Sequence, residues 1–178
     1  MSGRGRFATA TFDARLEREA TQAVGDAIAV LFETGAAGDR LGLVVVSDNA
    51  GSATSVQFWA DAQRTGVALA SPELFPWCLA NAPCGALARR FGVTGPNLTL
   101  LGEDEAMEAA FDQAEDLLAA GQVDAVVLVA IAYTQGEAPG RAVAWRGQRG
   151  DTTGSLRSAL RGAASLREAM AILAALGA

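Results

Sequence analysis

The stretch that decides the fold runs from residue 92 to residue 104 and reads Gly-Val-Thr-Gly-Pro-Asn-Leu-Thr-Leu-Leu-Gly-Glu-Asp. After the Gly-Pro pair it predicts a short strand over Asn97–Leu101 and a helix that runs from about Asp104 to Ala120. An apolar run at Ala125–Ile131 predicts a second strand. Because strands and helices follow one another in turn, the sequence favours an α/β layered domain.

The preceding residues show the same alternation of helices and strands. Leu41–Ser47 is short, continuously apolar and rich in valine, which is typical of a strand buried on both faces. Asp13 is expected to cap a helix over Ala14–Glu33, whose apolar residues recur every three to four positions. Further helices are expected near 53–65, 84–91 and 165–176, and a last strand near 141–145.

The composition excludes several classes of protein. The chain has 178 residues, and 51% of them are hydrophobic, which is ample material for the core of one domain. Its net charge of −6 disfavours nucleic-acid binding. The longest apolar run, Val123–Ala132, contains Asp124 and is too short to cross a bilayer, and the N-terminus lacks a signal-peptide pattern. We therefore expect a cytoplasmic protein.

The two cysteines, Cys78 and Cys84, lie six positions apart in a proline-rich segment. The chain has no histidine and no further cysteine that would complete a zinc site. We therefore expect two packed thiols, with no metal and no cofactor.

A longer pattern around the deciding stretch resembles one enzyme family. Residues 72–96 read Pro-Glu-Leu-Phe-Pro-Trp-Cys-Leu-Ala-Asn-Ala-Pro-Cys-Gly-Ala-Leu-Ala-Arg-Arg-Phe-Gly-Val-Thr-Gly-Pro, in register with Gly121 and the apolar strand that follows it. This pattern is similar to the segment before the nucleophile in β-ketoacyl synthases of the thiolase-like superfamily. The similarity covers about residues 10–146 and only the N-terminal half of the family. It implies a thiolase-like half-domain, a mixed sheet with helices packed on it.

The resemblance implies three parts in the chain. Residues 1–12 are expected to form an N-terminal arm, although Arg6–Phe12 also fits a short strand. Residues 13–146 would form the ketosynthase-like half-domain, and residues 147–178 an arginine-bearing loop with a C-terminal helix.

The chain departs from the family at the position of the nucleophile. Active members carry a reactive cysteine there and normally use two histidines from the C-terminal half, whereas this chain has Asp104 and no histidine. The resemblance therefore implies a degenerate homologue that is not an enzyme and has no catalytic residue. An enzymatic alternative has Asp104 as nucleophile, assisted by another carboxylate, Tyr133 or a cysteine. It would require that Asp104→Asn abolish activity while the fold is preserved.

The helix after the nucleophile position offers a simpler explanation of Asp104. At 100° per residue, its carboxylates fall on one face, formed by Asp104, Glu105, Glu108, Asp112, Glu115 and Asp116. The opposite face is apolar and consists of Ala106, Met107, Ala110, Phe111, Ala114, Leu117 and Leu118. Either this acidic face is open to water, since the second half of the family fold is absent, or the arginine-rich tail covers it.

These features lead to two hypotheses of different classes. In the first, the chain resembles the chain-length factors that pair with an active ketosynthase in type II fatty-acid and polyketide biosynthesis. Its partner interface would be the strand of Asn97, Leu98, Thr99, Leu100 and Leu101, which in the family pairs across the dimer axis. Arg157 and Arg161 would offer a contact for an acidic acyl carrier protein.

The second hypothesis is a stand-alone homodimeric module that binds an acyl chain or a carrier protein. The two differ in partner dependence, because a chain-length factor should be poorly soluble or unstable without its ketosynthase.

Overall fold

In the described part of the chain, five strands form a single mixed sheet in the order β1-β5-β4-β2-β3. The computed structural model describes residues 6–33, 35–102, 105–134, 138–151 and 165–177. Strands β2 (Leu41–Ser47), β3 (Asn97–Leu101) and β4 (Ala125–Ala132) are parallel, with β2 between the other two. Strand β5 (Gly140–Gln148) runs antiparallel to β4 and to β1 (Arg6–Phe12).

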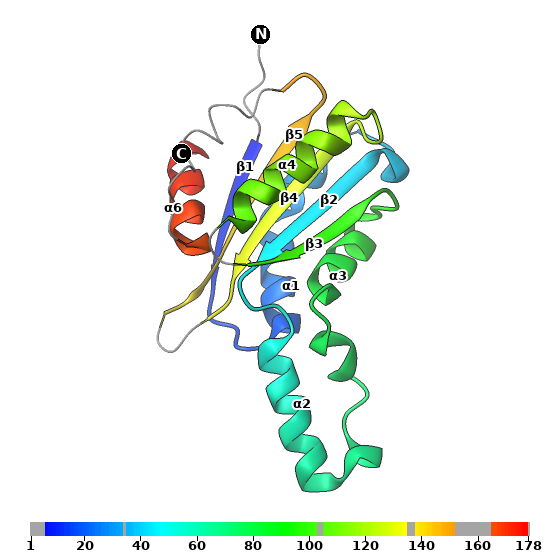
Figure 1. Cartoon of the computed structure of the whole chain (residues 1–178), viewed down its shortest axis with the longest axis vertical. Coiled ribbons are helices and arrows are strands. Elements are labelled where there is room, and N and C mark those ends of the chain that lie inside the picture. The colour runs from blue at the N-terminus through cyan, green and yellow to red at the C-terminus, as the bar shows by residue number, and fades with distance from the viewer. Residues whose placement is uncertain (1–5, 34, 103–104, 135–137, 152–164, 178) are drawn as a thin grey trace.

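Helices cover both faces of the sheet. Helices α4 (Ala106–Ala119) and α6 (Leu166–Gly177) lie on one face, and α1 (Glu17–Ile28) and α3 (Ala82–Phe91) lie on the other (Figure 1). Helix α2 (Ser52–Thr65) extends away from the sheet. Short 3-10 helices connect these elements: η1 (Ala29–Phe32), η2 (Gly38–Arg40), η3 (Val67–Leu69) and η4 (Phe75–Cys78). The α/β prediction of a sheet with helices packed on it is therefore confirmed.

The core consists of two apolar layers that share strands β2 and β4. Every residue of both strands is buried, as their uninterrupted apolar runs predicted. Alternate residues face opposite layers, so that Val45 packs toward α1 and α3 while Val44 packs toward α4 and α6. On the α4 side the rings of Phe111 and Trp145 lie 5.2 Å apart, and both are fully buried. Burial of each such side chain stabilises the fold by about 1.5–3 kcal/mol.

The N-terminal segment differs from the predicted arm. Arg6–Phe12 pairs with β5 along its whole length, which makes these residues an edge strand of the sheet and bears out the strand alternative. Residues 1–5 lie outside the described residues. At the other end of the chain, α6 buries Leu166, Met170 and Leu173 in the same layer as α4. The predicted boundary at residue 146 stays a prediction.

Helix α1 begins later than predicted. Its first residue is Glu17, its N-cap position is Leu16 without a side-chain cap, and Asp13 lies outside the helix. The predicted Asp13 cap is therefore wrong. One reason lies in the loop before the helix, where the Thr134 hydroxyl donates a hydrogen bond of 3.0 Å to the Ala14 carbonyl oxygen. The helix ends at Ile28, and the predicted last turns form the 3-10 helix η1.

An ion pair fixes the entry of β2 beside the entry of β4. Arg40 donates through Nε and Nη2 to the two oxygens of Asp124, at 3.2 and 2.7 Å. Its Nη1 also donates to the carbonyl oxygens of Gly121 and Gln122, at 3.0 Å each. The hydrogen bond with Arg40 lowers the pKa of Asp124 below its ordinary value.

None of the helices in the described ranges is long and apolar enough to cross a membrane.

We expect Asp124→Asn to lower the melting temperature modestly at pH 7. Since the folded-state pKa of Asp124 is depressed, its contribution is present above the unfolded pKa and is lost as the pH falls through the folded pKa. The wild-type and variant melting temperatures should therefore converge as the pH falls below the ordinary range of a carboxyl pKa, measured by thermal denaturation across pH. A difference that persists unchanged in acid would contradict this assignment.

Candidate partner interface

Strand β3 lies at one edge of the sheet, and among the described strands it pairs only with β2. Its residues, from Asn97 to Leu101, run parallel to Leu43–Ser47 of β2. No strand of the described part of the chain pairs with the other side of β3. An edge strand presents backbone N–H and C=O groups that a strand of another chain can pair with. The structure thus places all five predicted interface residues on an open sheet edge.

Two of the β3 side chains pack into the core of their own domain and do not contribute to the open edge. Leu98 and Leu100 pack against the apolar layer under α4. On α3, the buried Cys84 thiol donates a weak hydrogen bond, 3.5 Å long, to the Leu98 carbonyl oxygen. Leu101, at the end of the strand, is 55% exposed. The edge therefore offers backbone groups and one well-exposed apolar side chain, that of Leu101.

The connection between β3 and α4 contains the position that the sequence singled out. Asp104 lies outside the described residues, as do Arg157 and Arg161. The flanking elements are described: the Gly102 N–H donates to the Ser47 carbonyl oxygen at 3.1 Å, and α4 begins at Ala106 with Glu105 at its N-cap. The carboxyl end of β3 thus lies beside the carboxyl end of β2.

Helix α4 has the two faces that its sequence predicted. The buried residues match the expected apolar face and are Met107, Ala110, Phe111, Ala114, Leu117 and Leu118. Glu105 and Asp116 are exposed, while Glu108, Asp112 and Glu115 are partly buried. The choice between an open acidic face and one covered by the tail depends on residues 152–164, which lie outside the described part.

A helical arm, residues 52–79, projects from the sheet beyond α3 (Figure 1). It comprises α2, η3 and η4, and α2 buries only Thr54 and Ala62. Of the large apolar side chains exposed in the described residues, most lie on this arm: Val56, Trp59, Val67, Leu69, Phe75 and Leu79. Apolar side chains gathered on one exposed element are typical of an interaction surface.

A buried carboxylate holds the base of this arm. Glu17 is 1% exposed, and its oxygens accept hydrogen bonds from the backbone N–H groups of Ala53 and Thr54, at 2.9 and 3.0 Å. It also accepts a hydrogen bond from the Thr54 hydroxyl. These N–H groups belong to the first turn of α2, which has no partner within its own helix and is the positive end of the helix dipole. Glu17 of α1 thus caps α2.

Comparison with known proteins gives matches among solved structures only. No protein-family model and no curated protein matches the chain. The ishigamide ketosynthase/chain length factor superposes with a TM-score of 0.60 at 17% identity, over 75% of this chain. A ketosynthase (ApeO) in complex with its chain length factor (ApeC), from Xenorhabdus doucetiae, gives 0.59 at 16% identity over 78%. A β-ketoacyl synthase from Burkholderia phymatum gives 0.58 at 12% identity over 76%.

The fold is that of a ketosynthase-like half-domain. The aligned region corresponds to 43, 59 and 42% of the three solved chains, so this chain spans about half of their length. The resemblance that the sequence suggested is therefore confirmed at the level of the fold.

Tyr133 and Cys84, two of the groups that the enzymatic alternative needs beside Asp104, are held uncharged in the half-domain. Burial raises the pKa of Tyr133, and the nearby negative charge of Glu17 raises it further. Burial also raises the pKa of Cys84. Both groups therefore keep their protons near neutral pH, where a general base or a thiolate nucleophile would have to lose one. In the described residues, no three carboxylate or cysteine side chains gather as metal ligands would.

Sequence reasoning missed two parts of this interface. Glu17 looked like an ordinary residue of a helix, because its partners Ala53 and Thr54 are far away along the chain. The exposed arm had a signal in the sequence: Val56, Phe58 and Trp59 do not form one stripe, and a helix that is apolar on more than one side needs more than one partner.

We expect Glu17→Gln to lower the free energy of unfolding by about 1–3 kcal/mol, because it removes charge-assisted hydrogen bonds from a buried site. Urea denaturation would measure the change. The matched control is Glu19→Gln, since Glu19 lies in the same first turn of α1 but is exposed. Equal stability of the two variants would contradict the capping role.

Proposed function

We propose that this chain is a non-catalytic ketosynthase-like subunit that pairs with an active ketosynthase in type II polyketide or fatty-acid biosynthesis, as a chain-length factor does. The observation that carries the proposal is the open edge of β3, together with a projecting arm. This arm carries most of the large apolar side chains that are exposed in the described residues. The solved relatives supply the kind of partner, since one of them is a ketosynthase in complex with its chain length factor.

The edge and the arm together suit a protein partner. An edge strand gains backbone hydrogen bonds when a second strand pairs with it, and this pairing fixes the orientation of the two chains. Exposed aromatic and aliphatic side chains, such as Trp59, Phe75 and Leu101, are the anchors that protein interfaces bury at their centres. Segment 52–79 has three charged residues, Asp61, Arg64 and Glu73. Removing the arm from water therefore costs little desolvation free energy.

The chemistry of the chain supports a non-catalytic role. The nucleophile position carries Asp104, and the chain contains no histidine to assist condensation. The raised pKa values of Tyr133 and Cys84 disfavour both as replacement bases. The role proposed for this subunit is therefore to complete the surface of a partner that holds the reactive groups, and Arg157 and Arg161 stay candidates for contact with an acyl carrier protein.

A homodimeric binding module is the second candidate. The near-neutral arm and the open β3 edge suit another copy of the chain as well, because two identical edges can pair antiparallel about a twofold axis. Such a dimer would form without a ketosynthase.

We expect a stable one-to-one complex when the chain is co-expressed with the ketosynthase encoded nearest to its gene, detected by native mass spectrometry. Trp59→Glu should weaken this complex by at least about tenfold, because it places a charge in the apolar contact. Leu101→Lys should also weaken it, since a lysine at a sheet edge opposes strand pairing.

Two matched variants control for the general loss of an exposed apolar side chain. Val30 and Leu176 are each 49% exposed and lie outside both the arm and β3, so Val30→Glu and Leu176→Lys should leave the complex intact. A homodimer that does not bind the ketosynthase would contradict the chain-length-factor proposal and favour the second candidate. Equal weakening by all four variants would contradict the location of the interface.

We expect Asp104→Asn to leave the condensation rate of the purified complex unchanged within about twofold, because the proposal assigns all chemistry to the partner. Product formation from an acyl-loaded carrier protein and a malonyl extender would measure it, with the ketosynthase nucleophile variant as the negative control. Loss of activity in Asp104→Asn with an intact complex would restore the enzymatic alternative.

A further inference from the structure

A cavity of about 200 Å³ lies between α1 and α3, on the face of the sheet away from α4. Thr21 and Leu87 line it and are buried, whereas Trp77 forms a wall and is partly exposed. The cavity lies away from β3, and its wall Trp77, although it belongs to the arm, is not one of the exposed apolar side chains assigned to the partner contact. Its volume suits a molecule the size of a small substituted ring.

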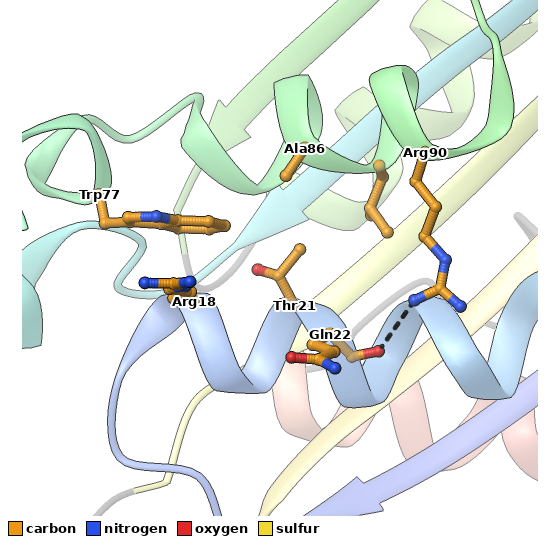
Figure 2. Close-up of a pocket in the computed structure, with 7 residues that line it drawn as sticks. Arg18, Thr21, Gln22, Trp77, Ala86 and Arg90 are labelled. Atoms are coloured by element: carbon orange, nitrogen blue, oxygen red, sulfur yellow. Dashed lines mark hydrogen bonds between the residues drawn. The ribbon is translucent and has the colours of Figure 1, made fainter. Parts of the chain in front are cut away.

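Two guanidinium groups lie at this cavity, one from each helix. Arg18 comes from α1 and Arg90 from α3, and Figure 2 shows the Arg18 side chain directly below the Trp77 ring. A planar cation beside an indole offers a flat apolar surface and a positive charge to the same ligand.

Arg90 is held in place by contacts with α1. Its Nη1 donates to the Gln22 carbonyl oxygen at 3.3 Å, and its Nη2 pairs with Asp26 at 2.5 Å. Gly25 makes this position accessible, because a Cβ atom there would lie 2.8 Å from Nη1 of Arg90. Arg90 therefore forms a fixed positive wall with part of its donor capacity already used.

Arg18 has more donor capacity to offer. In the described part of the chain, Nη1 of Arg18 lies 3.6 Å from a carboxylate oxygen of Glu73, which is long for a hydrogen bond. Both partners are well exposed, with 64% and 80% of their side-chain surface accessible, so water competes with this pair. A guanidinium has five N–H donors, and a carboxylate can accept two of them side by side.

We propose that this cavity binds a small carboxylate with a planar apolar body, with Arg18 pairing with the carboxylate and Trp77 stacking on the ring. The buried floor at Leu87 would contact the apolar body, and Arg90 would contribute positive potential at the opposite wall. Ligand binding would displace the contact between Arg18 and Glu73. Because this pair is exposed, breaking it costs little free energy.

The test uses the full chain and benzoate as the probe, followed by two-dimensional NMR of the ¹⁵N-labelled protein. The Trp77 indole and Arg18 Nε signals should shift and saturate with a dissociation constant on the order of 1 mM. The indole signals of Trp59, on the arm, and of Trp145, in the opposite layer, should stay in place and serve as internal controls.

Variants with opposite expected effects on benzoate affinity distinguish a loss of binding from a loss of the fold. Arg18→Gln and Trp77→Leu should each weaken benzoate binding by about tenfold, since each removes one of the two recognition elements. Glu73→Gln should tighten it by about threefold, because it removes the competing carboxylate. Arg64→Gln is the matched control, since Arg64 is also exposed and paired, with Asp61 at 2.5 Å, and should leave affinity unchanged.

Three outcomes would overturn the proposal. The first is the absence of Trp77 and Arg18 shifts at about 20 mM benzoate. The second is unchanged affinity in Arg18→Gln. The third is equal binding of benzoate and inorganic phosphate, because recognition would then depend on charge alone and not on the Trp77 surface.

Discussion

Burial of the parallel pair β2 and β4 on both faces dictates how the other elements are arranged. All residues of both strands are buried, so each face of the pair must be covered by another layer. Helices α1 and α3 supply one layer, and α4 and α6 supply the other. This requirement explains why a C-terminal helix, distant in sequence, buries Leu166, Met170 and Leu173 at 0–1% exposure beside α4.

The same arrangement leaves the functional features at the periphery. With β2 and β4 in the middle, β3 becomes an edge, and the segment between β2 and α3 has no sheet to cover. That segment becomes the arm, which is anchored at its base by Glu17 and exposes apolar side chains along its length. The proposed partner surface therefore consists of the β3 edge and the arm, which the two-layered core leaves uncovered.

The cavity beside Trp77 has a different origin. It lies between α1 and α3 next to η4, and its charged walls are held by exposed pairs rather than by the core. Its two arginines come from positions 18 and 90, and nothing in the local sequence of either helix relates them. Only the packing of α1 on α3, with Gly25 open toward Arg90, brings their side chains to one place.

Local periodicity in the sequence was enough to predict several of the helices and strands. The continuous apolar runs of β2 and β4, the two faces of α4 and the strand Asn97–Leu101 were all predictable, because burial on one or both faces leaves a repeating pattern. The resemblance around residues 72–96 supplied the fold. Tertiary structure alone decided the order of the strands, the pairing of Arg6–Phe12 with β5 and the capping of α2 by Glu17. Each of these joins residues far apart along the chain, and contacts of that kind leave no periodic trace in a single sequence.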